Sequence, residues 1–342
     1  MDTPKAKRVT IADVSEASGM SKAAVSLILN NKPGTRLSVE ATERVRAAAK
    51  ELGYRPNVAA QSLRSGKTRT LGLISDQVTV TRFASEMITG ILSAAEKRDH
   101  TVLIAETFGK PDQLVEAIEQ MAHRDVDGLI LGFMDSRRRD LKLPQTGLPT
   151  VLVNGLDESP SVAVLPNEAM SGAQAVQRVL ESGARSVALI GALEGAEKDP
   201  ETYPSISRRF ASLRGALAES SLEVLGNWVL EDWNPTDGYA ATTQMLAEGF
   251  RPDAIICAND RVAMGVFQAL AEKGLVPGED LSVLSFDDEI IASYLRPRLT
   301  SIRLPYEKMG ALAVDLLLDR KLEPGEHQID MPLIERDSMK GE

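Results

Sequence analysis

The 342-residue chain contains one cysteine, three histidines and few aromatic residues, which make up 4% of the sequence. A single cysteine cannot form an intramolecular disulfide, and Cys257 lies in the apolar run AIICA, which is typical of a buried small hydrophobic residue. The histidines His100, His123 and His327 lack the spacing of metal ligands. No apolar run approaches membrane-spanning length, and the polar start MDTPKAKRVT has no signal-peptide core. We therefore expect a cytoplasmic protein without a metal or cofactor.

Common enzyme motifs are also missing. The sequence has no G-x-S-x-G nucleophile elbow. The GKT at 66–68 does not fit a phosphate loop, because Gln61 stands where that motif needs glycine and a helix is expected before it. Asp287-Asp288 with Asn259-Asp260 could imitate a Mg²⁺ or acid/base site, so an enzyme remains an alternative that turnover assays on sugars would test.

Charge is distributed unevenly along the chain. Residues 1–69 hold 13 Lys and Arg against 6 Asp and Glu, whereas the remaining residues hold 26 against 43, and the whole chain has a formal net charge of −10. A basic leading segment on an acidic protein indicates a nucleic-acid-binding head attached to a body that does not bind nucleic acid.

The segment 10–30 predicts two short helices joined by a tight turn. Thr10 can cap the first helix, Gly19 suits the turn, and Ser21 can cap the second helix. The inward positions by helical spacing are Ile11, Val14 and Ala17 in the first helix and Ala24, Val25 and Ile28 in the second. This is a helix-turn-helix pattern, which presents its second helix to the DNA major groove. An ordinary helical bundle is the alternative.

A third helix is expected at about 38–52 and would close a small three-helix core. Its apolar side is predicted to consist of Val39, Thr42, Val45, Ala49 and Leu52. The following stretch, 54–68, joins head and body: residues 57–64 could form about two helical turns after Pro56, before Ser65-Gly66 ends them. Because so short a helix is marginal alone in water, a flexible linker is the other interpretation.

From Leu71 onward, short apolar runs alternate with amphipathic helices. The strand-like runs are TLGLIS, TVLIAE, GLILGF, TVLVNG, SVALIGA, NWVLED, AIICAND and LSVLSFDD, with helices expected at about 169–182, at about 208–220 and from about 238. This alternation predicts parallel, doubly wound sheets. There are too many strands for one compact sheet, so we infer two similar lobes.

Ligands of open parallel sheets bind in the crevice beyond the carboxyl ends of the strands. The residues directly past the expected strand ends are Thr81 to Phe83, Phe133, Asn154, Trp233, Asn259-Asp260 and Asp287-Asp288, and Arg209 opens a helix that can reach the same crevice. Amide and carboxylate groups with aromatic faces suit a sugar-like ligand. The alternatives are helix caps for the Asp and Asn residues, core packing for Trp233 and a solvated arginine pair for Arg208-Arg209.

Several separate motifs then carry a family resemblance. They are VTIADVSEASGMSKAAVSLILN, ATERVRAAAKELGYRPN, AAQSLRSGK and, near the end, VLSFDDEIIASYLRPRLTSIR. On these segments the chain resembles the LacI/GalR (lactose/galactose-repressor) family of bacterial transcriptional regulators over nearly its full length.

The resemblance implies an N-terminal all-α helix-turn-helix head at 1–55, a hinge helix and linker at 56–70, and an effector-binding and dimerisation domain at 71–342. That domain would be an α/β body of two doubly wound lobes with the periplasmic-binding-protein-like fold. The N-lobe would take about 71–167 and 301–330, and the C-lobe about 168–300 and 331–342.

Expected DNA contacts follow from the same resemblance. Lys22 and Ala23 fall on the base-reading positions, where lysine could reach a guanine and alanine a thymine methyl. Leu27 stands where some members have arginine, and Leu63 falls on the leucine wedge that opens a base step in the minor groove. The remaining expected contacts are Thr10, Ser21, Ser26 and Asn30, which would position phosphates, and Asn57 and Ala60 of the hinge.

Expected effector contacts follow in the body. Arg209 falls on the family's effector-binding arginine, and Trp233, Asn259 and Asp287 also match family positions, while Phe83, Phe133 and Asn154 follow from the strand ends. The chain departs from the family pattern where Thr81-Arg82-Phe83 replaces Asn-Pro-Phe, where Ser212 replaces glycine, and where Asn167 and Ser171 replace Asp and Gly.

We therefore expect a sequence-specific DNA-binding repressor, not an enzyme, whose operator affinity is controlled by a small sugar-like effector bound between two lobes. A homodimer on palindromic double-stranded operator DNA is the expected assembly, because a twofold protein matches a twofold site. A sugar-binding transport protein is the alternative from another class, but it would need an export signal and no basic head.

Overall fold

The computed structural model describes residues 9–30, 37–54, 66–77, 83–193, 195 and 198–341. The chain divides into two compact units, Met1–Thr68 and Arg69–Glu342. Among the described residues, no helix combines the length and apolar character needed to cross a membrane. The predicted hinge segment 57–64 lies outside the described residues.

The first unit contains the three predicted helices, α1 (Ile11–Ser18), α2 (Lys22–Leu29) and α3 (Val39–Glu51). The predicted caps are confirmed: the Thr10 side chain accepts from the Asp13 backbone amide, and that of Ser21 accepts from Ala24. Gly19 ends α1 in the left-handed region with φ at 66°, a conformation that glycine adopts without steric penalty. These local signals explain why the helix-turn-helix was readable from the sequence.

The core of this unit is smaller than predicted. The buried apolar residues that pack together in it are Val14, Val25, Ile28, Val45, Ala48 and Ala49. The prediction was wrong for Val39, which is 74% exposed, and for Leu52, which is 38% exposed, and Ala17 is exposed as well. Val39 and Val45 are six residues apart and therefore point roughly 120° apart around α3. Only one of them can face α1 and α2.

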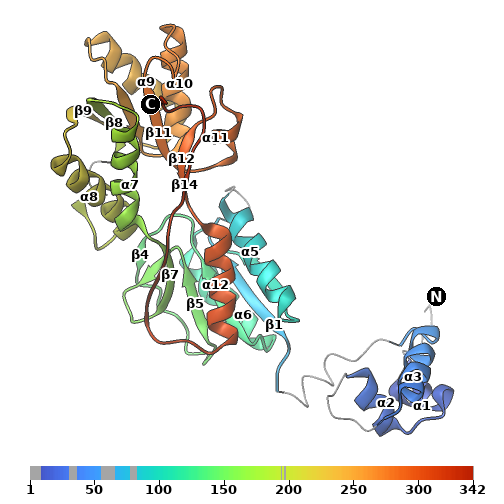
Figure 1. Ribbon diagram of the computed structural model, residues 1–342. Coiled ribbons are helices and arrows are strands. Elements are labelled where there is room, and N and C mark those ends of the chain that lie inside the picture. Colours follow the sequence, from blue (N-terminus) through green and yellow to red (C-terminus); the bar gives the residue numbers. More distant parts are fainter. Residues whose placement is uncertain are drawn as a thin grey trace, which may run out of the picture. The chain divides into compact units, whose positions relative to one another are not determined.

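The second unit begins with a six-stranded, wholly parallel sheet that forms the first lobe (Figure 1). Its strands are β1 (Thr70–Ser75), β2 (Thr101–Glu106), β3 (Gly128–Gly132), β5 (Thr150–Val153), β7 (Val162–Pro166) and β13 (Gly325–Ile329), in the order β13-β7-β5-β3-β1-β2. The helices are α5 (Phe83–Lys97), α6 (Pro111–His123) and α12 (Tyr306–Leu318), and the two-residue strands β4 (Arg138–Arg139) and β6 (Leu156–Asp157) pair beside the sheet.

A second six-stranded sheet forms the second lobe. Its strands are β8 (Ser186–Ala192), β9 (Glu223–Val229), β10 (Ala254–Cys257), β11 (Ser282–Asp287), β12 (Thr300–Arg303) and β14 (Leu333–Ile334), in the order β14-β12-β11-β10-β8-β9, with β14 antiparallel. The helices are α7 (Glu168–Glu181), α8 (Pro204–Glu219), α9 (Pro235–Ala247), α10 (Asp260–Glu272) and the short α11 (Ile290–Tyr294). The predicted two-lobed fold is confirmed. Helices α8 and α9 begin earlier than expected, because each has proline in its first turn.

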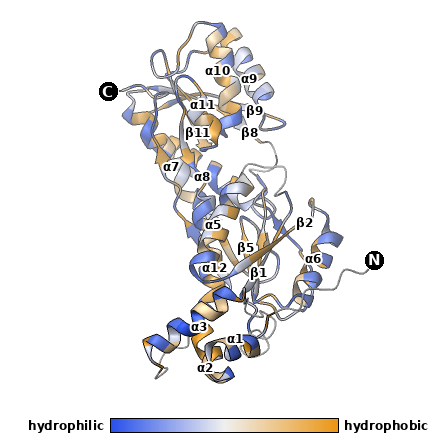
Figure 2. Cartoon of the chain, turned by 90° about the vertical axis from the view of Figure 1, so that its right-hand side faces the viewer, coloured by the Kyte–Doolittle hydropathy of each residue, from blue (hydrophilic) through white to orange (hydrophobic). Residues whose placement is uncertain are grey.

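Alternate residues of each strand face opposite layers, which explains the apolar runs of the sequence. In β1, Leu73 packs in one cluster with Met87 of α5, whereas its neighbour Ile74 packs in another cluster with Ile118 of α6. Figure 2 shows hydrophobic residues concentrated along strands such as β1 and β5, with hydrophilic residues on the outer sides of the helices. Both faces of each sheet are therefore covered by helices.

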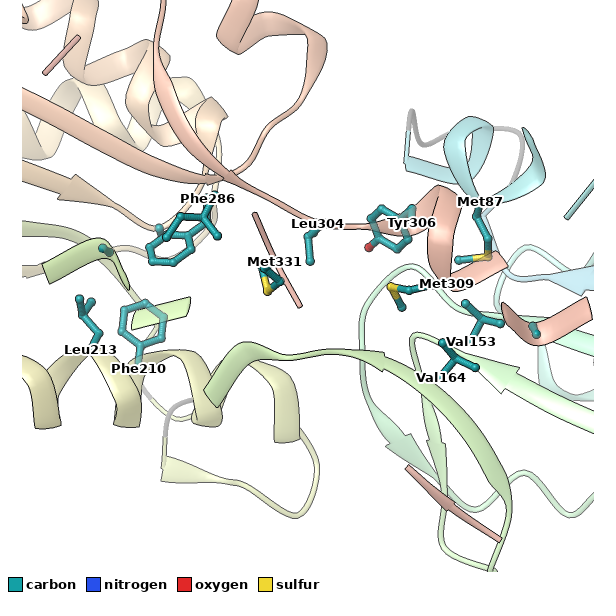
Figure 3. Close-up of a cluster of buried hydrophobic side chains, with 14 of the residues drawn as sticks. Met87, Val153, Val164, Phe210, Leu213, Phe286, Leu304, Tyr306, Met309 and Met331 are labelled. Atoms are coloured by element: carbon teal, nitrogen blue, oxygen red, sulfur yellow. The ribbon is translucent and has the colours of Figure 1, made fainter. Parts of the chain in front are cut away.

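Three segments connect the two lobes, at 166–168, 303–306 and 329–333. The prediction that residues 301–303 belong to the N-lobe is wrong, because they pair with β11 as part of β12 in the second sheet. Figure 3 shows Leu304 and Met331 lying between Phe286 and Phe210 of the second lobe and Tyr306 and Met309 of the first. The connecting segments therefore carry one continuous buried cluster from lobe to lobe.

Candidate nucleic-acid interface and effector site

The start of α2 presents an exposed polar surface. Ser21, Lys22 and Ala23 are exposed, whereas Ser26 and Leu27 are half-buried. A helix N-terminus carries partial positive charge and free backbone amides, and Lys22 adds a full charge there. This surface can approach the phosphates and base edges of DNA.

The other predicted DNA contacts of the head have local partners. Thr10 caps α1 and its hydroxyl donates to Asp13 Oδ2 at 2.8 Å, while Asn30 Nδ2 donates to the carbonyl of Ser26 at 2.6 Å. These bonds hold both side chains at the ends of their helices. Asn57, Ala60 and Leu63 lie outside the described residues.

A buried ionic cluster lies at the carboxyl ends of β8, β10 and β11 in the second lobe. Arg209 of α8 is held by both oxygens of Glu168, with Nε–Oε2 at 2.8 Å and Nη2–Oε1 at 2.6 Å. The same guanidinium donates to Asp287 Oδ1 at 3.2 Å and to the carbonyl of Ala258 at 3.0 Å. Arg209 and Asp287, predicted independently from a helix and a strand end, are therefore in direct contact.

Electrostatics in this cluster are set by burial. Burial raises the pKa of Asp287 to about 6; the carboxylates of Glu168 and Glu289 raise it as well, and Arg209 lowers it. For Arg209 burial favours the neutral form, but the neighbouring carboxylates raise its pKa above the ordinary value. Asp287 has φ at 97°, in the left-handed region that side chains other than glycine rarely adopt. Such strain at a strand end is typical of functional sites.

Trp233 and Asn259 lie next to each other in the same lobe. The Trp233 indole donates to the carbonyl of Gly191 at 2.6 Å, and its ring packs near Phe210. Asn259 caps α10 by accepting from the Val262 amide at 2.8 Å, and its Nδ2 lies 3.5 Å from the carbonyl of Trp233. Asn259 therefore performs the capping role that its position after a strand also allowed.

Phe133 and Asn154 lie together at the strand ends of the first lobe. Asn154 is fully buried; its Nδ2 donates to the Phe133 carbonyl at 2.9 Å and to the Tyr306 hydroxyl at 3.1 Å, and its Oδ1 accepts from Ser136. The guanidinium of Arg139 lies over the Phe133 ring, 4.7 Å from its centroid, in a cation–π contact. Phe83 is the first residue of α5, and Thr81 and Arg82 lie outside the described residues.

Sequence reasoning missed four residues of this region. Asp76 follows β1 and pairs with Arg139, Tyr306 starts α12, and Glu168 follows β7. The rule that selects residues past strand ends could have found Asp76 and Glu168. Burial, together with the charge of the nearby Asp135, raises the pKa of Asp76 to about 6, although Arg139 acts in the opposite direction.

Tyr306 lies between the two sets of charges. Burial raises its pKa well above the ordinary value, and Asp287, Glu168 and Asp76 add to the effect. Carboxylates of both lobes thus raise the pKa of the Tyr306 hydroxyl. Within the described residues, no three His, Cys, Asp or Glu side chains group as a metal site.

Comparison with known proteins agrees with this arrangement. Residues 10–57 match the model described as bacterial regulatory proteins, lacI family, and residues 176–339 match the periplasmic binding protein-like domain. The chain is 32% identical over 324 residues to the ribose operon repressor of Haemophilus influenzae, covering 93% of each chain. It is 30% identical over 341 residues to the transcriptional repressor PurR of Vibrio cholerae, covering 97% of this chain and 98% of that one.

Solved structures show the same likeness. A Lac repressor dimer bound to operator and the anti-inducer ONPF has a TM-score of 0.73 at 25% identity, covering 98% of this chain and 100% of that chain. The regulator CelR in complex with cellobiose has a TM-score of 0.62 at 25% identity, covering 97% and 100%. The two relatives named above, which cover 93% and 97% of this chain, are transcriptional repressors, not enzymes. The chain belongs to the lacI family of bacterial regulatory proteins and is a transcriptional repressor with a helix-turn-helix head and an effector-binding domain.

Proposed function

We propose that this repressor binds a palindromic operator as a homodimer and that a small sugar-like effector, bound between the lobes, controls its operator affinity. Its place of action would be the bacterial cytoplasm. The observation that carries the proposal is the contact between Arg209 and Asp287 at the carboxyl ends of the second sheet, with Trp233 beside them. Hydrogen-bonding charged groups and an indole at a strand-end crevice suit a polyhydroxylated ring.

The expected effector contacts are Arg209, Asp287, Asn259, Trp233, Phe133, Asn154 and Phe83. Among these, Arg209 and Asp287 would bind hydroxyl groups, and Trp233 would pack against the apolar face of the ring. Asn154 would act by holding Tyr306 and Phe133 in place, because its amide already bonds to both.

Control would pass through the segments that join the lobes. A ligand that contacts both lobes would change their relative angle, and thereby the separation of the paired 57–64 segments of a dimer. Those segments would fold on operator DNA or melt away from it, which couples two distinct sites through a disorder–order transition.

Replacing Asp287 by alanine tests the effector site. The Asp287→Ala variant should bind operator normally without ligand but lose the change in operator affinity that a bound sugar causes, because Arg209 keeps Glu168 as its partner. Fluorescence anisotropy with labelled operator, with and without each sugar of a panel, measures this. Asp337→Ala, which removes a half-exposed carboxylate of the same lobe, is the matched control. A normal response of Asp287→Ala would place the effector elsewhere.

Replacing Leu63 tests the hinge. Leu63→Ala should weaken operator binding while leaving sugar affinity intact, because a leucine wedge acts only on DNA. Unchanged operator affinity would remove the wedge role from Leu63.

A further inference from the structure

The positive charge of Arg209 in the effector site is already balanced by carboxylates of the protein itself. Glu168 takes two of its N–H groups, and Asp287 and the Ala258 carbonyl take two more. The side chains of Arg209 and Glu168 are 5% and 3% exposed. One face of the guanidinium also lies over the Phe286 ring, 4.6 Å from its centroid. Little of this cation is left to bind a ligand.

Among the acceptors of the same cluster, Glu168 is also fully used, because both of its oxygens accept from Arg209 and Oε2 accepts from the Ser171 hydroxyl as well; only Asp287 keeps an oxygen for a ligand. Two carboxylates, Glu168 and Asp287, meet one guanidinium. Asp287 Oδ1 accepts from Arg209, whereas its Oδ2 has no hydrogen-bond partner among the residues that the structure describes. A carboxylate oxygen at a binding surface needs a donor, and a second anion placed there would be repelled.

The strand ends of the first lobe also contain an arginine that two carboxylates share. Arg139 pairs with Asp135 and lies 3.6 Å from Asp76, so two carboxylates again share its guanidinium. A second arginine of this loop, Arg137, pairs with Asp135 at 3.2 Å and lies over the Tyr203 ring. Arg137 and Arg139 are thus paired with carboxylates within the protein, whereas Arg138 between them donates to the Asp157 carbonyl.

We propose that the effector is an uncharged polyhydroxylated molecule, and that Glu168 excludes acidic ligands such as sugar phosphates and sugar acids by occupying Arg209. This inference rests on the proposed function and narrows it to one chemical class. Hydroxyl groups donate to carboxylates and accept from the one remaining guanidinium N–H. A phosphate would have to displace Glu168 from a buried ion pair and leave that carboxylate without a cation, with only the Ser171 hydroxyl as a donor.

The wild-type repressor provides the first test. A panel of neutral monosaccharides, each with its phosphate ester and its uronic acid, is added to the full chain, and melting temperature and calorimetric affinity are measured. We expect at least one neutral sugar to bind, with its acidic forms weaker by about tenfold or more. An acidic form that binds as tightly as its parent would overturn the exclusion of anions but leave the sugar-like effector in place. A panel without any binding would overturn both.

The second test removes the proposed selectivity. Glu168→Gln keeps the shape of the side chain but removes its charge, so binding of the acidic forms should strengthen by about tenfold relative to wild type. Asp157→Asn is the control, because it removes a buried carboxylate that bonds to the Leu141 amide in the first lobe. Equal gains in both variants, or no gain in a folded Glu168→Gln variant, would contradict the role of Glu168. If that variant does not fold, the comparison of neutral and acidic sugars on the wild-type protein tests the exclusion of anions by itself.

Discussion

Arg208 and Glu326 join the two lobes through two parallel hydrogen bonds, Nη1–Oε2 at 2.7 Å and Nη2–Oε1 at 2.9 Å. Arg208 belongs to α8 of the second lobe, and Glu326 lies on β13, an edge strand of the first. A second contact lies in the β3–β5 connection, where the Arg138 amide donates to the carbonyl of Thr202 at 2.9 Å. The lobes are thus held together by side chains as well as by the three connecting segments.

The Arg208–Glu326 pair should stabilise the lobe arrangement seen here. A double-mutant cycle with Arg208→Ala and Glu326→Ala should give a coupling energy of about 1 kcal/mol, because the geometry is bidentate and the side chains are only 30% and 28% exposed. Urea unfolding measures it. The ligand-free variants should also show a larger radius of gyration in small-angle X-ray scattering.

Arg298 and Asp337 supply the control for this cycle. They form the same two-bond geometry at 2.7 and 3.0 Å, but within one lobe and about half-exposed. Their coupling should be smaller, and their loss should leave the radius of gyration unchanged. If both cycles give the same coupling energy and the same change in radius of gyration, Arg208 and Glu326 do not hold the lobes together.

Asp76 should make the stability of the body depend on pH. Its carboxyl keeps its proton up to about pH 6 in the folded chain, against an ordinary pKa of 3.8, mainly because of burial. Between these values the folded state binds more protons than the unfolded state, so the stabilisation present below pH 3.8 is lost as the pH rises through 6. Asp76→Asn cannot ionise, so its stability relative to wild type should increase over this window.

The increase should be at most about 3 kcal/mol, because one pKa unit corresponds to about 1.4 kcal/mol. Urea unfolding of wild type and Asp76→Asn at several pH values measures the difference. A difference that stays constant from pH 4 to pH 7 would show that Asp76 has an ordinary pKa.

Gly172 should be required for the position of Arg209. A Cβ at Gly172 would lie 2.2 Å from the Leu213 amide nitrogen and 2.8 Å from the Arg209 carbonyl, so α7 and α8 would have to separate. We expect Gly172→Ala to reduce the free energy of unfolding by about 1–3 kcal/mol. Sugar affinity should fall as well.

Gly215 is the control on α8, because a Cβ there meets nothing within 4 Å. Gly215→Ala should leave stability unchanged or raise it by roughly 0.5–1 kcal/mol, since alanine favours a helix interior. Thermal unfolding and sugar titration distinguish the two variants. Equal behaviour would mean that the two helices can move apart freely.

Lys22 should contribute to the recognition of operator sequence. Lys22→Ala removes an exposed charge from the first turn of α2, and operator affinity should fall by about 1–3 kcal/mol, with discrimination relaxed at one base pair. Anisotropy titrations at several salt concentrations measure both effects. Lys50→Ala, an exposed lysine in the last turn of α3, should have less effect on sequence discrimination. If both variants reduce the affinity for all DNA sequences to the same extent, Lys22 does not read a base.

Much of the fold could be predicted because its signals are local. Thr10, Gly19 and Ser21 mark helix ends within a few residues, and the alternation of apolar runs with amphipathic helices predicted both sheets. The errors came where local periodicity allowed two answers. Val39 was placed in the core of the head, but only packing against the other helices decides which side of α3 faces inward.

The effector site was predicted less completely. The strand-end rule and the family resemblance selected Arg209 and Asp287, which are indeed in contact. They did not select Glu168, which lies 41 residues before Arg209 in the chain and holds it with two bonds. The strand-end rule could have placed Glu168 near the site, but no local sequence pattern indicates that two residues so far apart in the chain form a pair.

By itself the sequence determined a basic three-helix head and a body of two parallel sheets, because charge, caps and strand patterns act over short stretches. Only the tertiary structure decided what the adjacent arginines do. Neighbouring residues of a helix point about 100° apart, so Arg209 is buried against Glu168 while Arg208 reaches Glu326 on the other lobe. Their partners come from distant parts of the chain that only folding brings to α8.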